Sequence, residues 1–133
     1  MKYILIILLF VTPLLVGQDL RLVAGFYDNR MPRSIYTYRE FEDKIELKLS
    51  TEYYDSGQKS YEVNYKDGLR SKKAWWYDNG NKKKEGTYKD GKEDGLWAIW
   101  YESGQKKMEA ILKDGELISD KCWDEDGNKI ECN

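Results

Sequence analysis

The sequence predicts an all-β protein: a row of antiparallel β-hairpin repeats with a period of about 23–24 residues, forming one elongated, twisted sheet. Three observations support this. A sixteen-residue stretch begins at Trp76 and returns in similar form at Trp100, 24 residues later. Each copy contains a short polar turn that ends in glycine. Around these turns, apolar and polar residues alternate with the period of two that is typical of strands.

Four copies of the repeat share one frame. They are YYDSGQKSYEVNYKDG at 53–68, WYDNGNKKKEGTYKDG at 76–91, WYESGQKKMEAILKDG at 100–115 and WDEDGNKIEC at 123–132. Glycine accepts a positive φ without steric cost, so a type I turn followed by a glycine bulge is the natural hairpin here. The predicted turn glycines are Gly57, Gly80, Gly104 and Gly127.

Residues 76–80 and 100–104, with Gly-Leu-Trp at 95–97, resemble the bacterial MORN-repeat variant family. The resemblance covers residues 53–132 and implies a row of antiparallel hairpins. Many members of this family are labelled antitoxins of toxin–antitoxin systems. The resemblance therefore also implies a protein partner, namely a toxin that is held inactive.

The first seventeen residues are predicted to be a signal peptide. Lys2 is followed by an almost wholly apolar run from Ile4 to Val16, which is too short to span a membrane. We expect cleavage after Gly17, and no cysteine follows that could carry a lipid. The protein is then exported, periplasmic or secreted, with no membrane span after signal removal. An uncleaved anchor or a buried strand is the alternative.

Residues 18–50 are predicted to cap the first repeat, because terminal repeats must shield an open sheet edge. Residues 26–38 resemble a degenerate copy that lacks the turn glycine. Alternating apolar positions from Ile45 to Tyr53 indicate a strand, whereas the spacing of Phe41, Ile45 and Leu49 also permits a short helix near 36–44. Residues 51–133 then form the hairpin repeats.

The turn geometry predicts a register and a core face. Trp100 should lie opposite Lys106, and Ala98 opposite Met108. Counting by twos along each strand then assigns a set of residues to the core: Tyr53, Tyr61, Val63, Tyr65, Ala74, Trp76, Tyr88, Ala98, Trp100, Met108, Ala110 and Leu112.

The opposite face carries more large rings than a solvated face needs. Coiling of the sheet or a covering N-terminal segment would explain them, since aromatic and aromatic–lysine pairs stabilise a sheet without any ligand. The third explanation is a binding surface. Its candidate residues are Trp75, Tyr77, Lys83, Trp97, Tyr101 and Lys107.

The two cysteines, Cys122 and Cys132, lie in the last hairpin. An exported protein meets an oxidising compartment, which permits a disulfide. The predicted register places Cys122 opposite Ile130, so Cys132 is one diagonal step away. That separation is near the limit of about 7 Å between Cα atoms, which leaves both the bridged and the free state open.

Several kinds of chemistry have no support in the sequence. The chain has no histidine, which removes Ser-His and Cys-His nucleophilic systems and most zinc sites. Five aspartates recur at turn positions, where turn formation explains them: Asp55, Asp67, Asp78, Asp90 and Asp114. Without residues 1–17 the net charge is −3, which gives no overall attraction to nucleic acid. We expect no enzyme activity, no cofactor, no metal site and no nucleic-acid partner.

Two functions from different classes remain. The favoured one is an exported, non-enzymatic scaffold that binds an unknown protein, an antitoxin- or immunity-like binder if the family label holds. The alternative is a module that binds cell-envelope glycans, because AWWYDNGN and AIWYESGQ resemble the aromatic hairpins of cell-wall-binding repeats. A purely structural envelope component is a third interpretation.

Overall fold

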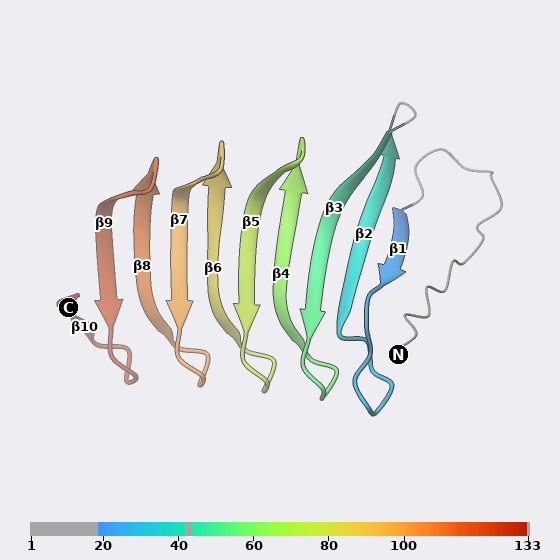
Figure 1. Ribbon diagram of the computed structural model, residues 1–133. Coiled ribbons are helices and arrows are strands. Elements are labelled where there is room, and N and C mark those ends of the chain that lie inside the picture. The colour runs from blue at the N-terminus through green and yellow to red at the C-terminus, as the bar shows by residue number, and fades with distance from the viewer. Residues whose placement is uncertain (1–18, 42–43, 133) are drawn as a thin grey trace.

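The computed structural model describes residues 19–41 and 44–132, and within them the fold is all-β. One open sheet contains ten strands in sequence order, with every neighbouring pair antiparallel (Figure 1). This confirms the predicted fold class. The strands are β1 (Asp19–Val23), β2 (Ser34–Phe41), β3 (Lys44–Tyr53), β4 (Lys59–Lys66), β5 (Leu69–Trp76), β6 (Lys82–Lys89), β7 (Lys92–Trp100), β8 (Lys106–Lys113), β9 (Glu116–Trp123) and β10 (Lys129–Ile130).

The short helix that the sequence permitted near 36–44 is wrong for the described part of that segment. Residues 34–41 form β2, which pairs with β1 on one side and with β3 on the other. Pairing on both sides satisfies the backbone of β2 in the sheet, and this tertiary context overrides a helical spacing of three apolar residues. The predicted signal peptide, residues 1–17, lies outside the described residues.

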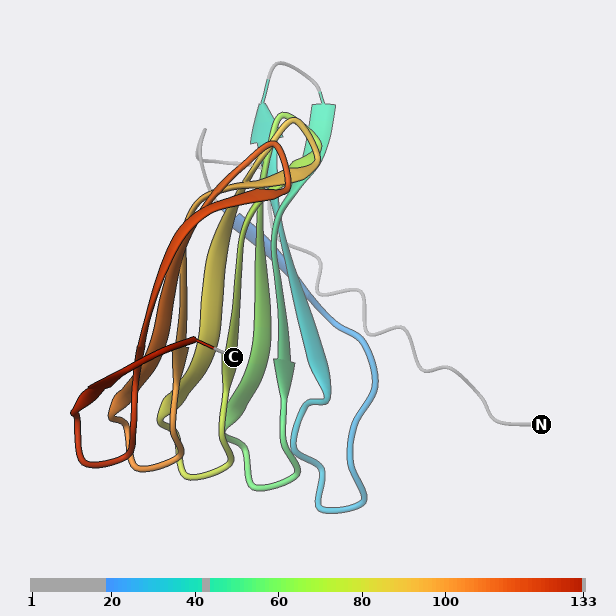
Figure 2. The ribbon, with the colours of Figure 1, turned by 90° about the vertical axis from the view of Figure 1, so that its left-hand side faces the viewer.

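The sheet is curved, and its two kinds of turn lie at opposite ends of the strands (Figure 2). At one end the four predicted turn glycines have φ between 84° and 91°. At the other end the two-residue Asp-Gly turns place both residues at positive φ, with Asp67, Asp90 and Asp114 at 50–52°. Such turns match the right-handed twist of the strands that they join, which keeps consecutive hairpins in register.

The loop before β2 has the same turn geometry without a glycine. The Tyr27 backbone N–H donates to Met31, and the Arg30 N–H donates to Tyr27. The corresponding bonds recur in the following hairpin, from Tyr54 to Gln58 and from Gly57 to Tyr54. Arg30 takes the glycine position with φ 67°. The degenerate sequence therefore keeps the repeat geometry in its turn.

A β-bulge beside each of the turns at Gly57, Gly80 and Gly104 changes which residues share a face. Trp100 lies opposite Lys106 as predicted, but the next pair is Ile99 with Met108. Lys107 is thus the extra residue of the bulge. The predicted pairing of Ala98 with Met108 is wrong, since Ala98 lies opposite Glu109. An inserted residue moves everything beyond it to the other face, because side chains alternate with a period of two.

The predicted core face is therefore wrong in composition, because both faces contain buried residues. One face holds the buried Val63, Trp97 and Ala110, and the other holds the buried Ala74 and Ala98. Trp76 and Trp100 are only half-buried, although the sequence assigned them to the core. We call the face that holds Val63, Trp97 and Ala110 the aromatic face. Its residues that are discussed below are Tyr61, Val63, Lys73, Trp75, Lys84, Gly86, Tyr88, Trp97, Ile99, Met108, Ala110 and Leu112.

Candidate binding face

A tyrosine at the start of three of the four glycine turns ties its hairpin to the next one, and the fourth turn begins with Asp124 instead. The Tyr54 hydroxyl donates to the Trp76 carbonyl at 2.7 Å, and Tyr77 donates to Trp100 at 2.9 Å. Two further bonds continue the series: Tyr27 to the Tyr53 carbonyl at 2.7 Å, and Tyr101 to the Trp123 carbonyl at 2.9 Å. The repeated aromatic pair in the sequence was the available signal for this ladder, but its partners lie a full repeat away.

Four of the six predicted surface residues belong to these junctions. The Lys83 ammonium lies 5.3 Å from the centre of the Tyr77 ring, and Lys107 lies 5.2 Å from that of Tyr101. Both lysines are the extra residues of their bulges. Each tyrosine thus has its hydroxyl bonded to the next hairpin and a cation over its ring, which gives it a structural role in joining repeats.

Trp75 and Trp97 form a separate group on the aromatic face. Their ring centroids lie 6.5 Å apart, and the Lys84 ammonium lies 5.5 Å from the first and 4.7 Å from the second. The ring centroids of Tyr61 and Trp75 lie 5.0 Å apart. Those of Tyr88 and Trp97 lie 5.4 Å apart, with the two rings edge-on. Such tilted and edge-on contacts are the favoured arrangements of aromatic pairs.

Gly86 fixes the position of the Trp97 ring. The two residues are cross-strand partners in β6 and β7, and a Cβ at Gly86 would come within 2.1 Å of the ring. Only glycine leaves room for the indole to lie against the backbone of β6. Trp97 is 6% exposed as a result, which makes it the largest of the buried hydrophobic side chains among the described residues.

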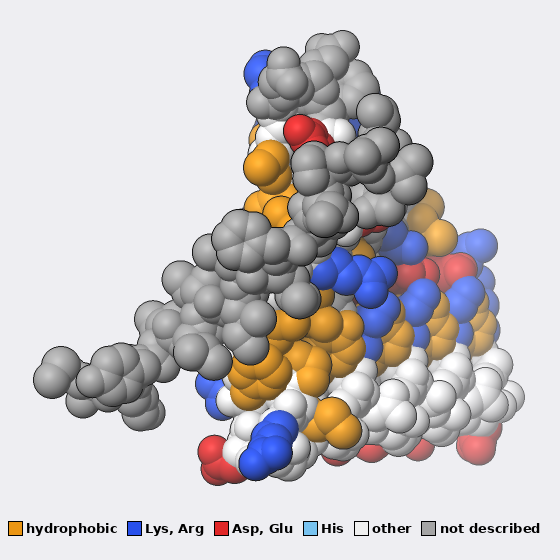
Figure 3. Space-filling model, turned by 90° about the vertical axis from the view of Figure 1, so that its right-hand side faces the viewer, with side chains coloured by type: hydrophobic (Ala, Val, Ile, Leu, Met, Phe, Trp, Pro, Cys, Tyr) orange, Lys and Arg blue, Asp and Glu red, His pale blue; other side chains and the backbone are white. Residues whose placement is uncertain are grey.

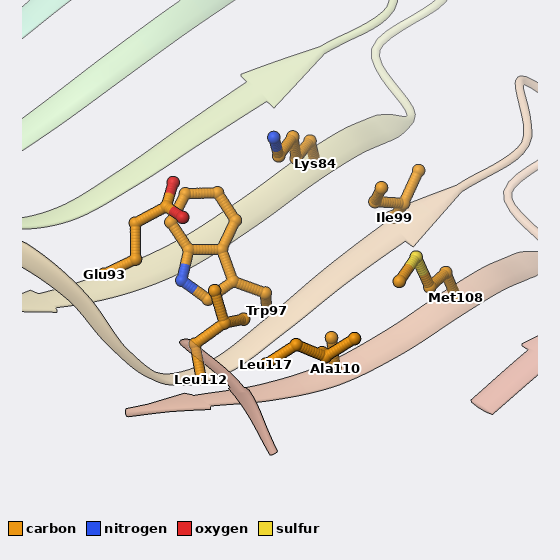
Figure 4. A pocket seen from close by; sticks show the side chains of 8 residues that line it. All are labelled: Lys84, Glu93, Trp97, Ile99, Met108, Ala110, Leu112 and Leu117. Carbon is orange, nitrogen blue, oxygen red and sulfur yellow. The ribbon is translucent and has the colours of Figure 1, made fainter. Parts of the chain in front are cut away.

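A pocket opens beside Trp97 on the aromatic face (Figure 4). Its volume is about 190 Å³, and side chains from four strands, β6 to β9, line it. The Trp97 Nε1 is buried and has no hydrogen-bond partner among the described residues. The lining is mostly apolar, with one cation and one acid: Lys84, Glu93, Trp97, Ile99, Met108, Ala110, Leu112 and Leu117.

The opposite face carries a ladder of ion pairs three residues apart, and Figure 3 shows basic and acidic side chains recurring in rows along the part of the sheet in view. The Lys59 ammonium lies 2.6 Å from the Glu62 carboxylate, and the Lys82 ammonium lies 2.9 Å from the Glu85 carboxylate. Lys106 forms the same ion pair with Glu109. The same three lysines lie 4.8–5.9 Å from the ring centres of Trp76, Trp100 and Trp123.

Glu85 has two lysine partners in this ladder. Lys72 lies 3.0 Å from its carboxylate, on the neighbouring strand, in addition to Lys82. Partial burial raises the pKa of Glu85, but the hydrogen bonds and charges of Lys82 and Lys72 outweigh that effect, so its pKa lies below the ordinary value.

The last hairpin is closed by a disulfide. Cys122 lies opposite Ile130 as the sequence predicted, and Cys122 and Cys132 are bonded with their Cα atoms 5.3 Å apart. The short strand β10 pairs only with Cys122 and Trp123. The rest of β9, from Glu116 to Lys121, is exposed and has no partner on its outer side among the described residues.

Comparison with protein families identifies the repeat unit. Residues 48–67 and 74–90 match the model of the MORN repeat variant. Two of the hairpin units in this chain thus match the MORN repeat variant. The first match covers the second half of β3 and all of β4. The second match covers the last residues of β5 and all of β6. The resemblance seen in the sequence is confirmed for the MORN repeat, and none of these comparisons supports the antitoxin label.

Two solved structures are similar in fold. One is the "Glycosylation Associate Protein (Gap123) complex" from Streptococcus agalactiae, with 15% identity, a TM-score of 0.49, and 77% of this chain covered. The other is "accessory secretory protein 1,2 and 3" in Streptococcus pneumoniae, with 14% identity, a TM-score of 0.47, and 75% covered. This chain spans 18% of the length of each. A comparison with curated proteins found no match, and no described residue belongs to a helix that could cross a membrane.

Proposed function

We propose that this MORN-repeat chain is an exported, non-enzymatic scaffold that binds another protein through the aromatic face. The observation that carries the proposal is the pocket beside Trp97, whose mostly apolar lining includes one cation, Lys84, and one acid, Glu93. Concave apolar sites with a few placed polar groups are the usual form of binding sites. Repeat sheets also offer the extended surfaces that suit protein partners.

An antitoxin- or immunity-like role is the more specific form of this proposal. The support for it is the family label alone. If the chain is exported as its first seventeen residues predict, a toxin that acts in the cytosol would be out of reach. The neutralised protein would then have to be exported as well.

The envelope-glycan alternative has weaker support from the geometry. Sugar binding by aromatic residues uses ring faces that are open to the ligand. Trp97 is 6% exposed, and the Lys84 ammonium lies over both Trp75 and Trp97. On the opposite face, lysines lie over Trp76 and Trp100 in the same way. The rings are therefore already engaged within the sheet.

The test is capture of a partner from an extract of the native cell envelope, with variants matched for exposure. Leu117, 56% exposed, lines the pocket, whereas Ile111, 42% exposed, lies on the opposite face. We expect Leu117→Asn to lose the captured protein and Ile111→Asn to retain it. If both variants capture the same proteins as the wild type, or if only polysaccharide is retained, the proposal is wrong.

A further inference from the structure

We propose that the partner presents an acidic segment to the aromatic face. A glutamate or aspartate of that segment pairs with Lys73 and Lys84, and a neighbouring leucine-sized side chain enters the pocket beside Trp97. The inference rests on the proposed function, because it names the chemistry of the partner segment that this face holds. It uses side chains of the aromatic face alone and involves neither outer edge of the sheet.

Two lysines interrupt rows of uncharged side chains on the aromatic face. The pairing registers place Lys84 in one row across β4 to β8 and Lys73 in the next row. The two lysines are diagonal neighbours on β5 and β6, so their backbones lie about 7–8 Å apart. In the following hairpin the equivalent positions are Met108 and Trp97, so the repeat fold does not require a cation at either one. The other members of the two rows over β4 to β8 are Tyr61, Trp75, Ile99 and Met108, and Val63, Gly86, Trp97 and Ala110.

The cations of the aromatic face lack the acid partners that the opposite face provides. Each lysine of the ladder on the opposite face pairs with a glutamate. Lys73, Lys84 and Arg70, which lies on the same face of β5, form no ion pair among the described residues. Burial lowers the pKa of Lys73, and the charges of Arg70 and Lys84 lower it further, whereas Glu93 acts in the opposite direction. A bound carboxylate would relieve this repulsion among the three cations.

The two ammonium groups are held beside rings, next to the pocket. The Lys73 ammonium lies 5.0 Å from the centre of the Tyr88 ring, and that of Lys84 lies 4.7 Å from the centre of the Trp97 ring. Both lysines are half-buried, so their side chains lose less conformational entropy when an anion binds. Lys84 also lines the pocket from β6, with Leu117 lining it from β9 (Figure 4). The cations and the apolar pocket are therefore contiguous.

The pocket fits one apolar side chain, which favours a peptide among the possible anions. Its volume of about 190 Å³ is close to that of apolar cavities of about 150 Å³ that bind benzene. A nucleic acid or an acidic glycan supplies charge without an aliphatic group, and the acyl chain of a lipid is much longer than the pocket. An acid next to a leucine-sized residue supplies both groups. The aliphatic lining consists of Ile99, Met108, Leu112 and Leu117.

The experiment selects peptides from a random phage-displayed library on the purified protein. We expect the selected peptides to share an aspartate or glutamate close to a leucine, isoleucine, methionine or phenylalanine. One such peptide, made synthetically, should bind about tenfold more weakly when its acid is replaced by the corresponding amide, and equally so when its apolar residue is replaced by alanine. Its affinity should also fall as the salt concentration rises.

Matched variants test the site with the same peptide. Lys84→Gln should weaken binding about tenfold, and Lys84→Arg, which keeps the charge, should retain it. Lys92→Gln is the control, because Lys92 is exposed on the opposite face of β7 and its replacement changes the net charge equally. This control should bind like the wild type. A retained amide spectrum shows that each variant is folded.

The inference is overturned if no peptide is selected, if the selected peptides lack acids, or if Lys84→Gln binds them as tightly as the wild type. Vesicles of phosphatidylglycerol are the second probe. Binding to these vesicles that Lys84→Gln abolishes, without any selected peptide, would mean that the site recognises an anionic membrane surface instead. If envelope capture still depends on Leu117 after either failure, the protein-binding function stands and only the acidic segment is excluded.

Discussion

At the scale of single residues, Trp97 and Gly86 show what the sequence could not reveal. Counting by twos from the turn placed Trp100 in the core and Trp97 outside it, whereas Trp97 is the buried one. The cause of this wrong face assignment is the bulge at Lys107, which adds a residue next to the turn. Alternation alone does not locate a bulge, since the extra residue resembles its neighbours. The role of Gly86 depends on a ring in another strand, which no local pattern records.

Replacing Gly86 by alanine should destabilise the protein by about 1–3 kcal/mol, because its Cβ would overlap the Trp97 ring. Urea unfolding monitored by tryptophan fluorescence measures the change. Gly91→Ala is the control: nothing lies within 4 Å of its added Cβ, and only its φ of 82° opposes the substitution. A loss no larger for Gly86 than for Gly91 would contradict the packing of Trp97 on β6.

At the scale of elements, the hairpins were largely predictable and their junctions were not. Glycine turns and alternation predicted the strands from β3 onward. The tyrosine bonds connect residues 22 to 26 positions apart, and they depend on how one hairpin sits against the next. Tyr77 and Tyr101 were therefore predicted as surface rings, whereas the structure gives each a bond across a junction.

Removing one tyrosine hydroxyl should cost about 0.5–1.5 kcal/mol, the net worth of a typical hydrogen bond. Tyr77→Phe and Tyr101→Phe each delete a bond of 2.9 Å to the next hairpin. Tyr65→Phe serves as the control, because the Tyr65 hydroxyl makes no hydrogen bond among the described residues. Equal unfolding free energies for all three variants and the wild type would refute the ladder as a source of stability.

The ion pairs of Glu85 predict a dependence of stability on pH. The pKa of Glu85 is lowered on folding, so the contribution of Glu85 to stability is present above its ordinary pKa of 4.5 and is lost as pH falls through the folded pKa. The pairs are partly exposed, so we expect about 1 kcal/mol or less. Unfolding free energies of the wild type and Glu85→Gln should differ at pH 7 and converge near pH 3. A constant difference over that range would exclude the lysine partners as its source.

At the scale of the whole molecule, stability should be local, because each hairpin contacts only its neighbours in the sheet. The disulfide between Cys122 and Cys132 closes the last of them. Reducing it, or replacing both cysteines by serine, should remove about 2 kcal/mol of local stability in β9 and β10. Amide hydrogen exchange should accelerate there and stay unchanged in β3 to β6. A uniform acceleration throughout the sheet would mean that the hairpins unfold as one unit.

The central claim is that a protein partner lies over the pocket beside Trp97, which is lined by β6 to β9. Site-specific photocrosslinking in the native cells tests it most directly, with p-benzoylphenylalanine in place of Leu117 or of Ile111. These positions lie on opposite faces, and only Leu117 lines the pocket. We predict a discrete crosslinked protein band from position 117 and none from position 111. Crosslinks from position 111 alone, or none from either position, would contradict the account.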